Sequence, residues 1–249
     1  MEAGNAAPRR YRGADAATRA FREAWGTYVA RDGRAGACWS ASALGTMAFG
    51  MQDVLLEPYG GQVLGMAVGD TTLLTATLAA GGLLGFSLAS AILSRGFDPA
   101  RMSTAGAWVG VPAFAAVILA ASVQSVPLFF CGALLIGFGA GVFSHGTLTI
   151  TMNRAPKDQV GLALGAWGAA QATAAGVAMA LGGVLRDLFA AAAASGAFGT
   201  TLNAPATGYA FVYAIELLLL FATIVVMGAL VRERRVVQGD PRLSLGGGE

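Results

Sequence analysis

Asp53 and Glu57 are four residues apart, so a continuous helix would place both carboxylates on one face. Like charges at this spacing repel each other, and a metal ion, another cation, an arginine or interfacial water can compensate them. Pro58 and the Gly60–Gly61 pair follow directly and favour the end of a helix. The two acids are therefore a candidate cation site, and hydration at an interface is the alternative.

Glu216 and His145 are the other two side chains whose type and position could support chemistry. Apart from Asp53 at the end of the first stretch, Glu216 is the only acid inside a long apolar stretch, where a carboxylate must be paired, protonated or bound to a ligand. Arg186 is the candidate partner, and a proton or ligand site and an unpaired neutral acid are the alternatives. His145 is the only histidine. Its imidazole could be the axial ligand of a metal macrocycle or a hydrogen-bonding group between helices.

Other polar patterns give no sign of catalysis. Arg95, Asp98 and Arg101 form a charge-dense turn that could hold two helix ends together. The sequence contains no phosphate loop, nucleophile elbow or HExxH motif, so we expect no enzymatic activity. Cys38 and Cys131 lie in apolar stretches without a CxxC pattern. They predict two buried free thiols and neither a disulfide nor a zinc site.

Long apolar segments must position these side chains. The 249 residues are 55% hydrophobic and 12% charged, whereas charged residues make up about a quarter of a soluble globular chain. A helix needs about 20 apolar residues to cross a bilayer, and six stretches reach that length: 35–55, 71–94, 102–122, 128–152, 161–185 and 209–231. The shorter stretch 188–199 predicts an interfacial or re-entrant helix. The predicted fold class is an all-α polytopic membrane protein.

The basic residues predict the orientation of these spans. With both termini in the cytoplasm, cytoplasmic segments hold 15 of the 16 Lys and Arg residues, and only Arg186 lies on the opposite side. The basic residues thus mark cytoplasmic loops, and no nucleic-acid partner is indicated. Residues 1–34 predict a cytoplasmic segment that lies as an amphipathic helix on the lipid surface or forms a solvated linker. Residues 232–249 predict a disordered cytoplasmic tail.

Small residues predict close helix packing within the membrane. Several glycine pairs have the GxxxG spacing, among them Gly106–Gly110, Gly137–Gly141 and Gly161–Gly165. Such notches pack neighbouring helices, and they could also hold a flat ligand or a partner helix. The first three spans would start on the cytoplasmic side of the membrane and the last three on the opposite side. This arrangement suggests an inverted repeat, and six such spans correspond to one half of a twelve-span carrier.

The string AFGMQDVLLEPYGGQVLGM at residues 48–66 resembles the PucC and LhaA family of the major facilitator superfamily. Its most specific members are Gln52, Asp53, Glu57, Pro58 and Tyr59. The GFGAGVFSHGTL stretch at residues 137–148 is similar to the tenth span of that family. The resemblance covers about residues 35–235 and corresponds to the C-terminal half of a twelve-span protein.

The resemblance implies a factor that binds or delivers bacteriochlorophyll during assembly of light-harvesting complexes in a bacterial inner, intracytoplasmic membrane. Its expected partners are membrane lipid, light-harvesting antenna polypeptides, and either a missing N-terminal six-span half or a second copy of the chain. The ligand-binding candidates are Gln52, Asp53, Glu57, Tyr59, His145 and Glu216. A proton-coupled small-molecule carrier of the same superfamily, with Glu216 as the coupling acid, is the alternative.

Overall fold

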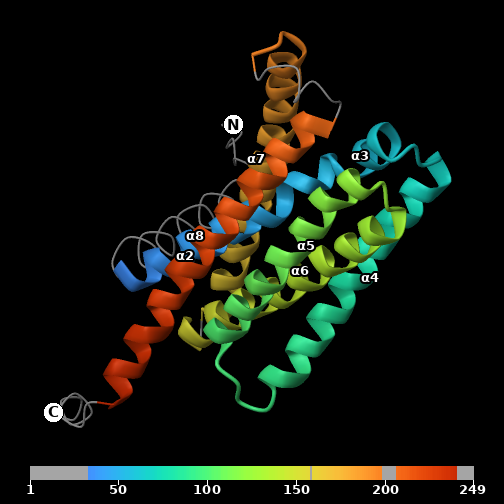
Figure 1. Cartoon of the computed structure of the whole chain (residues 1–249). Helices are drawn as coiled ribbons and strands as arrows, with labels where there is room; N and C mark the ends of the chain where they lie inside the picture. Colours follow the sequence, from blue (N-terminus) through green and yellow to red (C-terminus); the bar gives the residue numbers. More distant parts are fainter. Residues whose placement is uncertain (1–32, 158, 198–205, 240–249) are drawn as a thin grey trace, which may run out of the picture.

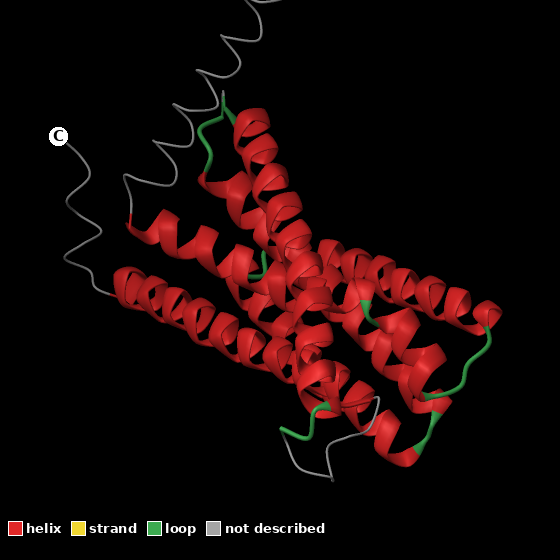
Figure 2. Cartoon of the chain, turned by 90° about the horizontal axis from the view of Figure 1, so that it is seen from above, coloured by secondary structure: helices red, strands yellow, loops and turns green. Residues whose placement is uncertain are grey.

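The computed structural model describes residues 33–157, 159–197 and 206–239, and every regular element within these ranges is helical (Figures 1 and 2). Five helices in them are long and apolar enough to cross a membrane. The described elements, in chain order, are α2 (Gly33–Gly50), η2 (Met51–Val54), α3 (Leu56–Val63), α4 (Val68–Leu93), α5 (Pro99–Val123), α6 (Val126–Arg154), α7 (Val160–Ala194) and α8 (Ala206–Gly239). The prediction of an all-α membrane protein is confirmed.

The first predicted span differs from the structure. Residues 35–55 were expected to form one helix, but α2 ends at Gly50 and is followed by the single 3-10 turn η2 and the short helix α3. A 3-10 turn within a helical segment often marks a functional hinge or local strain. The break falls within the 48–66 string, so the residues of greatest interest lie where the regular helix stops.

Two further boundaries differ from the prediction. The stretch 188–199 was expected to form a separate helix, but residues up to Ala194 continue α7 without interruption. The alanine run at 190–194 explains this extension, because alanine has the highest helix propensity. The tail was expected to be disordered from residue 232, yet α8 continues to Gly239. The predicted amphipathic segment at 1–34 falls almost entirely outside the described residues.

Side-chain caps define where the central helices begin. Asp98 precedes α5 and accepts a hydrogen bond from the backbone N–H of Arg101 at 2.9 Å, with Pro99 in the first turn. Ser125 caps α6 in the same way through the N–H of Leu128. The charge-dense turn at Arg95 thus contains a helix cap, and Gly96 makes the turn with a φ of 84°.

The helices form two groups that meet along α5 and α8. In the first group α6 lies between α4 and α5, and in the second α2 packs against α7 and α8 (Figure 1). Glycines bring α4 and α6 into backbone contact: a Cβ at Gly81 or Gly85 would collide with a carbonyl oxygen of α6, and one at Gly137 or Gly141 with a carbonyl oxygen of α4. The Gly137–Gly141 pair therefore packs helices, as its spacing predicts.

The third glycine pair has a different environment. A Cβ on Gly161 or Gly165 would meet nothing within 4 Å, so this face of α7 is open. Helices α4 and α7 are also the least covered of the five apolar spans. Cys131 is exposed on α6, which makes the prediction of a buried thiol wrong at this position. The prediction failed because apolar sequence in a membrane protein also faces lipid.

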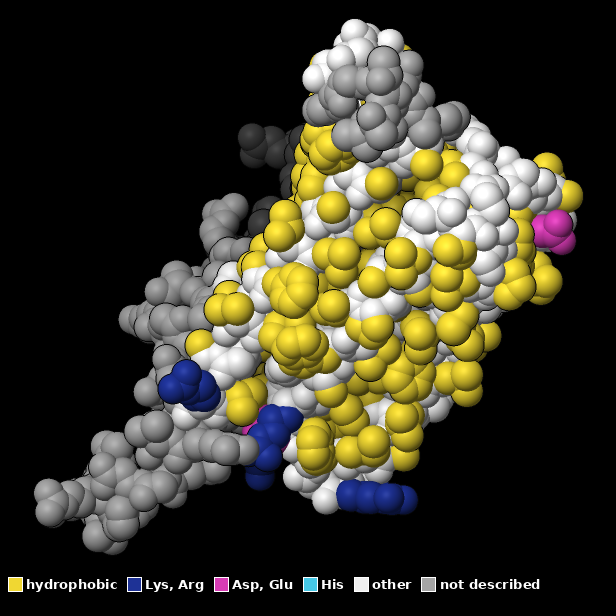
Figure 3. All heavy atoms as spheres, in the orientation of Figure 1, with side chains coloured by type: hydrophobic (Ala, Val, Ile, Leu, Met, Phe, Trp, Pro, Cys, Tyr) yellow, Lys and Arg dark blue, Asp and Glu magenta, His cyan; other side chains and the backbone are white. Residues whose placement is uncertain are grey.

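The outer surface has the character expected of a lipid-facing protein. Figure 3 shows hydrophobic side chains spread over most of one face, with Lys and Arg side chains gathered toward the end where α4 leads into α5. Large apolar side chains that are exposed in the described part of the chain include Leu83, Leu84 and Trp108.

Candidate functional site

A cavity of about 400 Å³ lies where α2 and η2 meet α4, α6 and α7. This volume is in the range of small-molecule sites, which is roughly 300–1,000 Å³. Its walls are mainly apolar or glycine residues from α4 and α6, and its polar side chains come from α2, η2 and α6. The lining residues are Thr46, Phe49, Gly50, Gln52, Asp53, Leu78, Gly82, Phe86, Ile136, Gly137, Ala140, Gly141, Phe143, Ser144 and Ala175.

The break after α2 is stabilised by Glu216. The backbone N–H of Gln52 belongs to the first turn of η2, where amide groups lack an acceptor within the helix. It donates to the Oε1 atom of Glu216 on α8 at 2.7 Å. An unsatisfied amide is costly in a membrane, and the side chain of Glu216 is completely buried. This acid therefore caps a broken helix from a neighbouring span.

The side chain of Gln52 connects this cap to the cavity. Gln52 is 2% exposed, and its Nε2 atom donates to the Oδ1 atom of Asp53 and to the backbone oxygen of Phe49. Asp53 lines the cavity and has an exposed side chain. Glu216, Gln52 and Asp53 form a continuous polar chain from α8 to the cavity wall.

Glu57 does not share a site with Asp53. The continuous helix that would place both acids on one face is interrupted at Leu55, so they lie on separate elements. Glu57 is exposed and accepts a hydrogen bond from the hydroxyl of Thr75 at 2.5 Å, which joins α3 to α4. It does not line the cavity.

Tyr59 belongs to the packed core. Its hydroxyl donates to the backbone oxygen of Val117 at 3.1 Å, and its ring lies against Phe129, Tyr209 and Tyr213. The side chain is 1% exposed and does not line the cavity. Within the 48–66 string, Gln52 and Asp53 reach the cavity, while Tyr59 fixes α3 to the rest of the bundle.

His145 lies beside the cavity and not among its lining residues. Its ring packs edge-on against Phe86, with 4.2 Å between the ring centroids, and Phe86 lines the cavity. The Nδ1 atom is buried and has no hydrogen-bond partner among the described residues. His145 thus contacts a residue of the cavity wall without itself lining the cavity.

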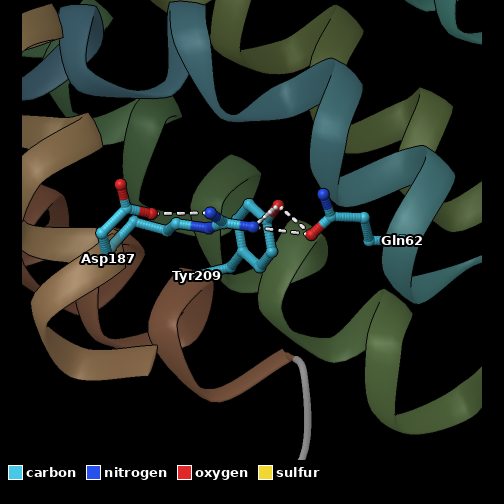
Figure 4. A network of polar contacts seen from close by, with 4 residues as sticks. Gln62, Asp187 and Tyr209 are labelled. Atoms are coloured by element: carbon cyan, nitrogen blue, oxygen red, sulfur yellow. Dashed lines mark hydrogen bonds and ion pairs between the residues drawn. The ribbon is translucent and has the colours of Figure 1, made fainter. Parts of the chain in front are cut away.

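Arg186 pairs with a different set of residues from the one predicted. Its guanidinium bonds to Asp187 at 2.6 Å, to Gln62 at 2.6 Å and to the hydroxyl of Tyr209 at 2.7 Å (Figure 4). The expected pairing of Arg186 with Glu216 is therefore wrong. Arg186 and Tyr209 lie near the facing ends of α7 and α8, whereas Glu216 lies two helical turns further along α8.

The Arg186 network gives a first testable prediction. The Tyr209 hydroxyl also donates to Gln62 at 2.8 Å, so this phenol joins α3, α7 and α8. We expect Tyr209→Phe to lower the free energy of unfolding by about 1 kcal/mol, because it removes two partly buried hydrogen bonds and keeps the ring. Thermal unfolding in detergent measures this loss, and Tyr11→Phe, in the N-terminal segment, is the control. A loss no larger than that of the control would contradict the prediction.

Sequence reasoning missed a polar contact between α2 and α7. The hydroxyls of Ser42 and Thr46 both donate to the Oε1 atom of Gln171, and Thr46 lines the cavity. Ser42, Thr46 and Asp53 are separated by four and seven residues. This helical spacing was the available signal, since it predicts one polar face directed at a neighbouring span.

Comparisons with known proteins cover most of the chain. Residues 2–235 match the family model described as PUCC protein. The chain is 56% identical over 189 residues to Protein PucC of Cereibacter sphaeroides, covering 76% of this chain and 40% of that protein. It is 59% identical over 167 residues to Protein PucC of Rhodovulum sulfidophilum, covering 67% and 37%.

A further relative matches nearly the whole chain. The chain is 50% identical over 236 residues to a Rhodobacter capsulatus protein described as an uncharacterized protein in the puhA-bchM intergenic region, covering 93% of this chain and 49% of that protein. The chain therefore spans less than half the length of the curated relatives that it matches.

Proposed function

Because the chain belongs to the PUCC protein family, we propose that it is an assembly factor for light-harvesting complexes that binds or delivers bacteriochlorophyll. The observation that carries this proposal is the cavity between the helices, which combines apolar and glycine walls with a polar edge at η2. The macrocycle would lie against these walls, and its apolar tail would extend into lipid.

The absorption spectrum of the protein purified in mild detergent from a phototrophic host tests this proposal. We expect a near-infrared bacteriochlorophyll band that Gly82→Leu removes, because Gly82 lines the cavity and a Cβ there meets only an ordinary contact at 3.7 Å. Gly165→Leu adds the same side chain at an open position outside the cavity and should keep the band. A colourless protein whose deletion leaves antenna levels unchanged would refute the function.

The proposed function also implies the binding partners of the chain and the membrane in which it lies. A second six-span unit, either the remaining half of a longer protein or another copy of this chain, would cover the open faces of α4 and α7. Together the two units would form a major facilitator fold, and the described chain would be one three-plus-three half. Light-harvesting antenna polypeptides and membrane lipid are the other partners. The membrane is the bacterial inner membrane, with both termini in the cytoplasm.

This function requires no catalysis by the protein. Bacteriochlorophyll is bound as cargo, and no described residue is assigned a catalytic role. Conversion of chlorophyllide by the isolated protein would contradict this part of the proposal.

A proton-coupled carrier is the second candidate, and Glu216 favours it. The side chain is completely buried, and its Oε2 atom has no hydrogen-bond partner among the described residues. Buried membrane acids of this kind often carry protons. If the carrier is correct, Glu216→Gln should abolish proton-coupled flux. If the assembly factor is correct, the unaltered protein should show no flux at all.

A further inference from the structure

The wall of the cavity carries one ionisable side chain. Thr46, Gln52, Asp53 and Ser144 are the polar residues of the lining, and of these only Asp53 can be charged. Thr46 and Ser144 contribute hydroxyl groups, and Gln52 contributes a neutral amide. No described lining residue is basic, so the wall holds no positive charge that balances the carboxylate. A single negative charge in mainly apolar surroundings therefore sets the electrostatic character of the cavity.

Gln52 holds this carboxylate in place. Its Nε2 atom donates to the Oδ1 atom of Asp53, and its backbone N–H donates to Glu216 on α8. A hydrogen bond donated to a carboxylate stabilises the ionised form, and Asp53 is exposed at the cavity. The polar chain behind Asp53 ends in a second acid and not in a cation. Asp53 thus presents a fixed negative charge to a molecule in the cavity.

Two basic side chains described elsewhere do not offset this charge. Arg186 is bound within its own network at the facing ends of α7 and α8 (Figure 4). His145 contacts the wall residue Phe86 but is not itself part of the lining. A ligand with a negative group would therefore meet Asp53 without a protein cation of the lining to bind that group.

Such a negative group would be destabilised in two ways. The cavity volume is about 400 Å³, so a compact molecule inside it lies within roughly one Debye length of Asp53, which is about 8 Å at physiological ionic strength. Mobile ions consequently leave much of the repulsion unscreened. The apolar walls also displace the water around the anion, and burial of an unpaired charge is unfavourable. A neutral ligand meets neither penalty.

We propose that Asp53 is a specificity-determining residue that excludes negatively charged ligands from this cavity. This inference rests on the proposed function, which supplies the class of ligand. Bacteriochlorophyll is the prenyl ester of a propionate side chain on its macrocycle, whereas bacteriochlorophyllide carries that side chain as a free carboxylate. The cavity takes the ester and rejects the acid. Esterification of this carboxyl group is then the class of reaction that must supply the cargo, and the chain acts after it.

Titration of the detergent-purified protein with bacteriochlorophyllide and with its methyl ester tests the inference. The two pigments have the same macrocycle and differ in one negative charge. We expect the methyl ester to bind at least about tenfold more tightly in a slightly alkaline buffer. Equal affinity, or tighter binding of the acid, would overturn the exclusion and leave pigment binding intact. Absence of binding by both pigments and by bacteriochlorophyll would instead remove the proposed function, and this inference with it.

Asp53→Asn tests whether Asp53 is the residue responsible. The substitution removes the charge, keeps the size of the side chain and keeps an oxygen that can accept from Gln52. We expect the acid to bind at least about threefold more tightly than it does to the parent protein, and the methyl ester to stay within about twofold. The partition of each pigment into detergent is the same for every variant, so differences between variants report binding by the protein.

Glu57→Gln is the matched control. It removes a negative charge from the same string, but Glu57 does not line the cavity, so the preference for the methyl ester should not change. A preference that Asp53→Asn leaves unaltered, or that both substitutions reduce equally, would overturn the assignment to Asp53.

Discussion

Gly137→Ala is expected to lower the free energy of unfolding of the membrane domain by at least about 2 kcal/mol. A Cβ at this position would collide with the backbone carbonyl of Leu78 on α4. A backbone oxygen cannot turn aside as a side chain can, so α4 and α6 would have to separate. Their contact is continuous through Gly81 and Gly85, and one added methyl group would loosen all of it.

Gly165→Ala is the control for this experiment. Nothing lies within 4 Å of a Cβ at Gly165, and alanine is favoured over glycine in a helix by about 1 kcal/mol. This variant should therefore be as stable as the parent protein or slightly more stable. Heating in detergent followed by size-exclusion chromatography measures both variants. Equal losses would show that the α4–α6 contact is not the tight interface described above.

The contrast between these glycines shows what sequence can predict about packing. Gly137–Gly141 and Gly161–Gly165 have identical spacing, yet the first pair is closed by α4 and the second is open. The GxxxG motif predicts that another helix can pack closely against the glycines. Which helix does so, if any, depends on the tertiary structure. Hydropathy likewise predicted five of the spans, because it depends on length and composition alone. It could not predict the break at Gly50, since the residues after it are also largely apolar.

The sequence predicted the residues of the candidate site better than it predicted the contacts that these residues make. Gln52 and Asp53 belong to the most specific part of the sequence, and both line the cavity. The partner of Glu216 was missed, because a backbone N–H becomes available only where the helix breaks. Arg186 was expected to reach Glu216, but the facing ends of α7 and α8 offer it nearer partners. Side-chain type thus indicated which residues matter, and backbone geometry decided what they bind.

Glu216→Ala is expected to lower the free energy of unfolding by about 3 kcal/mol, and Glu216→Gln by no more than about 1 kcal/mol. Alanine removes the acceptor of the Gln52 N–H and leaves this amide buried without a partner. The substitution also creates a cavity, because the side chain of Glu216 is completely buried. Glutamine has the shape of a neutral glutamic acid and keeps one oxygen for the same hydrogen bond.

Thermal unfolding in detergent compares the two variants, and pigment titration of each shows whether the cap also shapes the cavity. Glu216→Ala should weaken binding of bacteriochlorophyll, because Gln52 and Asp53 at the edge of the cavity lose their support, while Glu216→Gln should keep it. Equal destabilisation by both variants would mean that the carboxylate charge, and not the hydrogen bond, holds η2 in place. A stable Glu216→Gln protein that binds pigment normally would show that Glu216 supports η2 through its hydrogen bond and not through its charge.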